Sequence, residues 1–375
     1  MNPATSLYLD LFRFGLAFEV FLSHYCSGRL SGGLFWQLGG NLGHLAVIGF
    51  FVLSGLVIAY SVEVKDTTLH SYCVSRLSRL YSVVLPAVLL TLVVDAIGSR
   101  ISPALYTEDW GFTDSYPLLR ALLAVTFTSH LWFYNFQVFS NGPFWSLPYE
   151  FWYYVFFGAI CFLSGRARLV AAALAMIIAG PRILFFLPIW MLGVGAYRVM
   201  STVQIGRPIG WLMFSASILL VLACEYFRLP DRSLEFAEGT FSDATIKLLC
   251  QVSWTPYDYV FGLLVAVNII GFHSIHEAFE GFLLRFRTPI RWLAGLTFSL
   301  YLFHLPLLQF YAAISPWPET DKWHRSLLIF LPLATVAILG SLTERRRYKL
   351  RRYLAKVIPD ESRWPFIGSR HGVTR

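Results

Sequence analysis

Apolar runs of roughly 17 to 25 residues recur along the whole chain, and this repetition constrains the fold more than any other feature. Each run is long enough to cross a hydrocarbon core about 30 Å thick as a helix. Composition agrees, because 56% of the 375 residues are apolar, 14% are charged and the mean hydropathy is +0.58. We therefore expect an all-α protein, a polytopic bundle of transmembrane helices in a lipid bilayer.

About ten crossings are expected, in one integral membrane domain that covers residues 1–375. A short apolar piece at 168–179 ends at Gly180 and Pro181. An eleventh crossing there would put the two termini on opposite sides of the membrane, so we expect this piece to pack as a half-helix or bent extension. The expected crossings are 7–27, 42–62, 80–99, 118–136, 145–164, 183–200, 208–226, 255–273, 292–313 and 325–343.

Basic residues stand in short clusters at the ends of the apolar runs, as topology signals do. The net charge of +8 therefore gives no reason to expect a nucleic-acid partner. Positive-inside counting puts both termini and a basic tail at 344–375 on the cytoplasmic side, and Arg166 and Arg168 violate the rule. The clusters that obey it are Arg76 with Arg79, Arg198 with Arg207, Arg285 with Arg287 and Arg291, and 344–356.

The N-terminus argues against a cleaved signal peptide, and the cysteines argue against disulfides and a zinc site. The first apolar segment has neither a basic n-region nor a small-residue cleavage site, so we expect it to be retained. The five cysteines are scattered without CxxC pairs, which predicts neither structural disulfides nor a zinc site. No bound metal is expected.

The first expected helix carries Asp10, Arg13, Glu19 and His24. At about 100° per residue, Arg13 and His24 point within roughly 20° of one another, some 16 Å apart along the axis, with Asp10 on the same face. Glu19 points elsewhere. A charge near mid-bilayer costs about 2.5 to 3.5 kcal/mol, which favours a cavity or a partner inside the bundle. The alternative is that Asp10 and Arg13 pair near the cytoplasmic end, leaving His24 as an ordinary helix-end residue.

Other polar residues recur at the ends of later spans. Arg76 and Arg79 are three apart at the cytoplasmic border, either as a topology anchor or as two guanidinium forks for phosphates. Glu150 needs a cationic or hydrogen-bonding partner at its membrane boundary. The remaining candidates in these spans are Trp145, Ser146, Ser299, Tyr301 and His304.

Six short motifs appear in an order that matches a known family. They are Asp10-x-x-Arg13-x10-His24, "FFVLSG" at 50–55, Arg76-x-x-Arg79, "WSLPYEFWYY" at 145–154, "FSLYLFH" at 298–304, and Glu344 before the tail. Together they resemble the acyltransferase 3 family of integral membrane proteins. Members of this family transfer acyl groups, usually acetyl, onto envelope sugars and other small acceptors.

The resemblance implies an O-acetyltransferase of the bacterial inner membrane, with acetyl-CoA as acyl donor and a carbohydrate or glycolipid as acceptor. His24 would be the base, because an imidazole pKa can lie near neutrality, and an acid such as Glu150 would orient it. Arg13 and Asp10 would complete the catalytic set, and Arg76 and Arg79 would bind the coenzyme phosphates. The residues assigned to substrate binding are Trp145, Ser146, Ser299, Tyr301 and His304.

Two departures and two rival functions accompany this interpretation. The family has Gly-Val-Asp-Leu where this chain has "AVIG" at 46–49, and Arg346 replaces a proline. A transporter or flippase of a lipid-linked sugar, with His24, Glu150 and His304 as a proton relay, explains the buried ionisable groups equally well. It does not explain the arginine pair. An inactive partner in an envelope-polymer complex is the third candidate. The sequence leaves open the acyl group, the acceptor, the oligomeric state and any covalent acyl-histidine.

Overall fold

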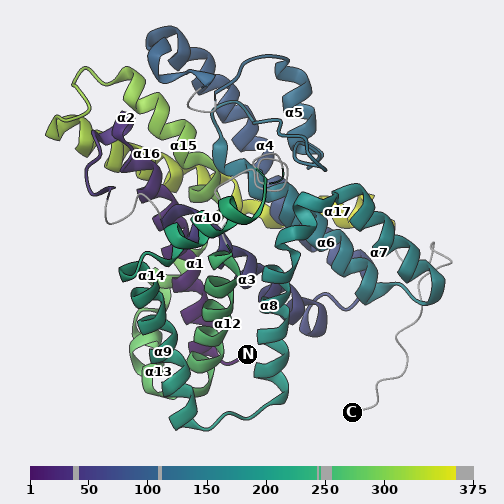
Figure 1. Ribbon diagram of the computed structural model, residues 1–375. Coiled ribbons are helices and arrows are strands. Elements are labelled where there is room, and N and C mark those ends of the chain that lie inside the picture. The colour runs from purple at the N-terminus through teal and green to yellow at the C-terminus, as the bar shows by residue number, and fades with distance from the viewer. Residues whose placement is uncertain (37–41, 109–111, 243–244, 246–255, 360–375) are drawn as a thin grey trace.

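The computed structural model describes residues 1–36, 42–108, 112–242, 245 and 256–359 (Figure 1). Every regular element in this part of the chain is a helix. The longer helices are α1 (Pro3–Tyr25), α3 (Leu42–Val64), α4 (Leu69–Ile101), α6 (Ser146–Phe162), α7 (Gly165–Ala179), α8 (Pro181–Thr202), α9 (Arg207–Tyr226), α12 (Tyr257–Ile275), α15 (Thr297–Ile314) and α16 (Lys322–Leu342). The shorter ones are α2 (Gly28–Ser31), α5 (Pro117–Val125), α10 (Leu229–Thr240), α13 (Glu277–Arg285), α14 (Arg287–Ala294), α17 (Arg347–Val357) and the 3-10 turns η2 (Pro103–Leu105), η4 (Gly142–Trp145) and η5 (Glu344–Arg346).

The predicted polytopic helical bundle is confirmed, although the number of crossings is not. Seven described segments are long and apolar enough to span a bilayer: α3, α4, α8, α9, α12, α15 and the run Lys322–Val357. The expected first and fifth crossings form helices α1 and α6, but α1 carries the charged residues and α6 has only 17 residues. Residues 360–375 of the expected tail lie outside the described residues.

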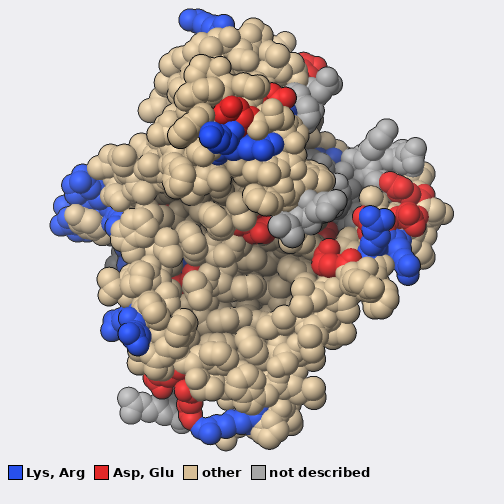
Figure 2. Space-filling model, turned by 90° about the vertical axis from the view of Figure 1, so that its left-hand side faces the viewer, with Lys and Arg blue, Asp and Glu red and all other residues tan. Residues whose placement is uncertain are grey.

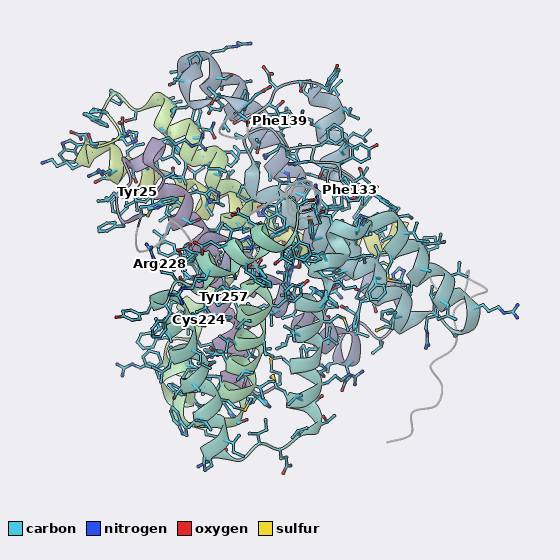
Figure 3. The ribbon with its side chains drawn as sticks, viewed as in Figure 1. Tyr25, Phe133, Phe139, Cys224, Arg228 and Tyr257 are labelled. Carbon is cyan, nitrogen blue, oxygen red and sulfur yellow. The ribbon has the colours of Figure 1, made fainter. Side chains whose placement is uncertain are left out.

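The expected crossing at 118–136 is wrong. Only α5 forms there, and its nine residues extend about 14 Å, less than half of a hydrocarbon core. The chain then leaves the helix, because Phe127, Trp132 and Phe139 have φ angles of 55°, 54° and 56°, which a right-handed helix excludes. Figure 3 shows Phe133 and Phe139 in this loop.

Buried hydrogen bonds hold the loop that follows α5. Asp95 on α4 accepts from the Ser140 backbone nitrogen at 2.9 Å and from its hydroxyl at 2.7 Å. The Asn141 side-chain amide donates to the Leu302 carbonyl at 2.9 Å. These contacts over-determine the loop conformation, which is the condition under which left-handed non-glycine residues persist.

The segment α7 stops where the sequence predicted. Gly180 has φ 82° and Pro181 begins α8, so the chain turns sharply between the two helices. At 15 residues α7 is about 22 Å long, shorter than a hydrocarbon core. It packs against α6 and α8 at one edge of the bundle (Figure 1).

The helices divide into central and peripheral ones. In the most apolar windows of α15 and α3, 83% and 78% of residues are buried, against 11% for α9 and 22% for Lys322–Val357. Helix α1 packs against α3 and α15 in the middle of the bundle. The exposed apolar side chains of the peripheral helices suit contact with lipid tails. On the face shown in Figure 2, the charged residues gather in a few separate groups.

Helices α3 and α8 approach with little side chain between them. A Cβ atom on Gly55 would overlap the Trp190 carbonyl, and one on Gly193 would overlap the Val52 carbonyl. Glycine at both positions therefore permits the close contact. The contact brings the Trp190 indole nitrogen to 3.2 Å from the Ser54 hydroxyl, beside the cavities described next.

Candidate active site

Two cavities lie along α1. The first, which we call the arginine chamber, has a volume of about 580 Å³ and the second, the histidine chamber, about 920 Å³. The charged residues that line the arginine chamber are Arg13, Lys65, Arg76, Arg79, Arg291, Arg345, Arg347, Arg351, Asp10, Asp66, Glu150 and Glu344. The ionisable residues that line the histidine chamber are His24, His44, His130, Glu225, Arg228, Asp231 and Asp258.

The first helix contributes to both chambers. Asp10 and Arg13 line the arginine chamber, and His24, eleven residues beyond Arg13 or about 16 Å along the axis, lines the histidine chamber. Asp10 pairs with Arg13 at 3.0 Å and with Arg291 at 2.5 Å, so the ion pair considered as an alternative is also present. Glu19 lines neither chamber among the described residues.

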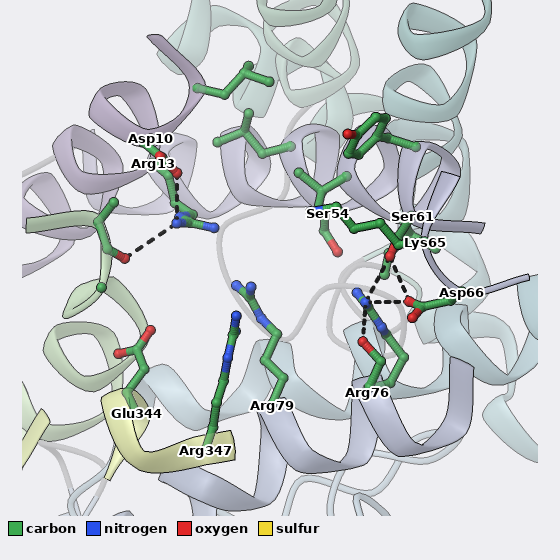
Figure 4. A pocket seen from close by; sticks show the side chains of 18 of the residues that line it. Asp10, Arg13, Ser54, Ser61, Lys65, Asp66, Arg76, Arg79, Glu344 and Arg347 are labelled. Carbon is green, nitrogen blue, oxygen red and sulfur yellow. Dashed lines mark hydrogen bonds and ion pairs between the residues drawn. The ribbon is translucent and has the colours of Figure 1, made fainter. Parts of the chain in front are cut away.

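The predicted arginine pair divides into one fixed and one available guanidinium (Figure 4). Arg76 is buried and donates to Asp66 at 2.9 Å and to the Ser61 hydroxyl at 3.1 Å. The Arg79 guanidinium makes no hydrogen bond or ion pair within the described chain, and it extends into the chamber. Arg76 therefore builds the wall, while Arg79 is available to a ligand.

Sequence reasoning missed Arg347. This residue begins α17, and Figure 4 shows its guanidinium beside that of Arg79, again with no partner that the structure describes. Two unpaired cations side by side favour a bound anion, because planar guanidinium groups bind phosphate oxygens in pairs. The signal in the sequence is the basic run at 344–356, which positive-inside counting explains equally well as a topology marker.

Glu344 and Ser299 act on helix α15. The Glu344 carboxylate accepts from the Ser299 backbone nitrogen and from its hydroxyl, both at 3.0 Å. Ser299 is the third residue of α15, so Glu344 caps a helix to which it does not belong. Ser299 is fully buried and lines neither chamber among the described residues, which makes it a support rather than a ligand contact.

Glu150 has the predicted hydrogen-bonding partners but does not orient His24. It lines the arginine chamber and accepts from the Ser54 hydroxyl at 2.7 Å and from the Tyr154 hydroxyl. Within the described chain it makes no contact with His24. The ring next to His24 is instead that of His304, with the two ring centroids 5.0 Å apart.

The hydrogen bonds of the histidine pair fix their tautomers. His24 Nδ1 lies 2.8 Å from the Val20 carbonyl, which can only accept, so this nitrogen carries the proton. His304 likewise donates from Nδ1 to the Leu300 carbonyl at 2.9 Å, and its Nε2 lies 3.3 Å from His24 Nδ1. This leaves Nε2 of neutral His24 unprotonated and able to accept a proton.

Tyr301 stands at the boundary between the chambers. Its hydroxyl donates to the Pro143 carbonyl at 2.8 Å and accepts from Ser146 at 2.7 Å. Its ring packs edge-on against Phe50 with centroids 5.7 Å apart. Phe50 lines the arginine chamber and Tyr301 the histidine chamber, so these two rings form a partition.

The far wall of the histidine chamber holds two more histidines. His44 Nε2 donates to Asp258 at 2.9 Å, and its ring stacks on Trp145 with centroids 6.5 Å apart. His130 lies in the loop after α5, outside the spanning helices. Burial, helped by the nearby Arg182 charge, lowers the pKa of His130 to about 3, so the ring is neutral near pH 7.

Comparison with known proteins assigns the family. A family model described as an acyltransferase domain, that of acyltransferase 3, matches residues 6–343. The chain belongs to the acyltransferase 3 family. Comparisons with curated proteins and with solved structures gave no match. Within the described residues, no group of three histidine, cysteine or acidic side chains is placed to hold a metal ion.

Membership of acyltransferase 3 makes the protein a multi-pass membrane acyltransferase. The chain departs from the family pattern at "AVIG" (46–49) and at Arg346, and the structure shows where both lie. In "AVIG", Val47 lines the histidine chamber and Ile48 is fully buried, so no carboxylate from this stretch reaches the chamber. Arg346 is exposed in η5, between the Glu344 cap and Arg347.

Proposed function

We propose that this acyltransferase moves an acetyl group from acetyl-CoA to a hydroxyl of a carbohydrate acceptor, such as a cell-envelope or exported glycan. The protein would lie in the bacterial inner membrane with both termini in the cytoplasm. The arginine chamber would then open to cytoplasmic acetyl-CoA, and the histidine chamber would receive the acceptor from the other side.

The observation that carries this proposal is the separation of charge between the two chambers. The described lining of the arginine chamber has eight basic and four acidic side chains, a balance of +4, which suits a donor that carries several phosphates. Arg79 and Arg347 supply guanidinium groups that make no ion pair within the described chain. A proton-relay transporter has no need of such a pair.

His24 is the base in this scheme. Its Nε2 takes the proton of the acceptor hydroxyl while that oxygen attacks the thioester carbonyl carbon. The carbon–sulfur bond then breaks, and the imidazolium returns its proton to the leaving thiolate. His304 contacts Nδ1 of His24 at 3.3 Å. This contact would hold the His24 ring so that its reactive Nε2 faces the histidine chamber.

The thioester must reach His24 from the phosphate site, along the face of α1. Asp10 and Arg13 stand at the donor end of this path, and the rings of Phe50 and Tyr301 stand across it. The acyl end therefore has to pass between these two rings, or the rings have to separate, for the reaction to take place.

The first experiment measures binding and turnover of radiolabelled acetyl-CoA by purified protein in nanodiscs. Wild type is compared with His24→Gln and with His324→Gln, a control histidine that is buried against Leu30 and Ser315 and lines neither chamber. We expect all three to bind acetyl-CoA, and only His24→Gln to lose transfer, by roughly 10² to 10⁴-fold. Absence of binding by folded wild type would overturn the proposal and favour the transporter or the inactive partner.

A further inference from the structure

The wall of the histidine chamber contributed by α3 and α12 carries a second imidazole that the mechanism above does not use. His44 donates from Nε2 to the Asp258 carboxylate, and the His44 and Asp258 side chains are 14% and 1% exposed. The other ring nitrogen of His44 is Nδ1, which this pair leaves unused. That atom is buried and has no hydrogen-bond partner among the described residues.

Local packing places this pair at the chamber rather than in the core. A Cβ atom on Gly43 would overlap Ser23 of α1, so glycine lets the start of α3 lie directly against α1. Ser23 and His44 consequently line the same chamber. Asp258 stands in the first turn of α12, where the helix dipole favours an anion.

The chamber around this pair carries little positive charge. Its described lining has three carboxylates, Glu225, Asp231 and Asp258, against one guanidinium, Arg228, a formal balance of −2 when the histidines are left out of the count. Arg228, which lies between α9 and α10 (Figure 3), already pairs with Asp231 at 3.8 Å. An acid group on the acceptor would therefore meet net negative charge and find no free cation among these residues.

We propose that the His44–Asp258 pair is the acceptor-binding site, and that it selects a hydroxylated ring without an acid group. The inference rests on the proposed function. His44 Nδ1 forms a hydrogen bond with one acceptor hydroxyl, Trp145 packs against the ring, and a second hydroxyl is left for His24. His44 thus positions the acceptor and takes no proton from it.

Two substitutions test the pair, each in the full-length protein in nanodiscs. His44→Gln removes the imidazole. Asp258→Asn removes the acceptor that holds the proton on Nε2. The acceptor source is a polar glycan and glycolipid extract of the cells in which the protein is naturally made, supplied at increasing concentration with radiolabelled acetyl-CoA. His324→Gln is again the matched control.

We expect each substitution to raise the extract concentration needed for half-maximal transfer at least tenfold, while the Kd for acetyl-CoA stays within twofold. Because the two residues act as a unit, the double variant should be no worse than His44→Gln alone. A structural role would instead change acetyl-CoA binding as well. Unchanged acceptor dependence in both variants would overturn the site.

The class of acceptor is tested on the wild-type product. Tandem mass spectrometry after partial hydrolysis identifies the sugar residue that carries the labelled acetyl group. A neutral or amino sugar supports the inference, and a uronic acid or phosphorylated sugar overturns it while leaving the proposed function intact. No labelled product at all, from protein that folds, would instead overturn the proposed function, and this inference with it.

Discussion

The arginine chamber and the histidine chamber share helix α1 but treat charge in opposite ways. In the first, several arginines pair with acids and so build the wall, as Arg76 does with Asp66, while Arg79 and Arg347 are left without a described partner. In the second, His24 is held through Nδ1 and His44 through Nε2, and the other ring nitrogen of each makes no described hydrogen bond. One chamber presents unpaired cations, and the other presents ring nitrogens without a hydrogen-bond partner.

The comparison teaches which residues to assign to a ligand. A polar side chain that an ion pair or hydrogen bonds already hold in place supports the site, and a guanidinium without a described partner, or a ring nitrogen left without one, is available to the substrate. By this rule Arg76, Ser299 and Glu344 are supports. The same rule proposes Arg79 and His24 as ligand groups. The following predictions test that division.

The largest effect is expected where a supporting pair is broken. Arg76→Gln leaves the buried Asp66 carboxylate unpaired, which costs about 3 to 5 kcal/mol of folding free energy. The purified variant should unfold at a markedly lower temperature than wild type. Adding Asp66→Asn should restore much of the loss. A stable Arg76→Gln protein with weak acetyl-CoA binding would show instead that Arg76 binds the donor.

The available cations should affect donor binding. Arg79→Gln and Arg347→Gln should each raise the Kd for acetyl-CoA roughly tenfold, since a hydrogen bond to a charged group contributes about 1.5 to 3 kcal/mol. Thermal stability should be unchanged, because neither side chain has a described partner to lose. Arg198→Gln, on the exposed pair with Glu63, serves as control. Equal Kd values in all four proteins would remove the phosphate assignment.

Acid should lower the stability of the folded protein, because His130 in the histidine chamber is held neutral. Its folded pKa of about 3 lies below the unfolded value near 6.5, so the unfolded chain binds the proton first and stability falls as pH drops below 6.5. At pH 5 the loss is about 2 kcal/mol. Unfolding temperatures measured at pH 7.5 and pH 5 should differ less in His130→Gln than in wild type, and an identical drop would refute this origin.

The smallest effect concerns the partition. Phe50→Ala should let water from the histidine chamber reach the thioester and raise release of coenzyme A without acceptor by roughly fivefold, or about 1 kcal/mol in the barrier. Phe50→Leu keeps most of the bulk and should behave as wild type. The measurement is thiol release from acetyl-CoA in acceptor-free nanodiscs. An unchanged rate in Phe50→Ala would mean that these rings do not separate the two sites.

Sequence reasoning recovered most of the helical frame because apolar length and helical periodicity are local properties. It placed Asp10, Arg13 and His24 on one face of α1, and the structure puts all three at chambers. It also predicted the end of α7 at Gly180 and Pro181. The family followed from motifs that the family model then matched over residues 6–343.

What the sequence could not supply depends on contacts between distant segments. Nothing local distinguishes Arg76 from Arg79, because the difference lies in Asp66 on the preceding loop. The pairing of His24 with His304 instead of Glu150 depends on how far α15 reaches along α1. The false crossing at 118–136 has an apolar composition, and only the left-handed aromatic residues and the Asp95 contacts reveal a loop.

The aromatic partition also has a consequence for bioenergetics. Two polar cavities set end to end along α1 would, if joined, give water and ions a route through the bilayer, and a protein of this kind would discharge the gradients on which its cell depends. Phe50 and Tyr301 close that route with two rings in edge-on contact. In the proposed function, the same pair that the acyl group has to pass would therefore also keep the membrane electrically tight between turnovers.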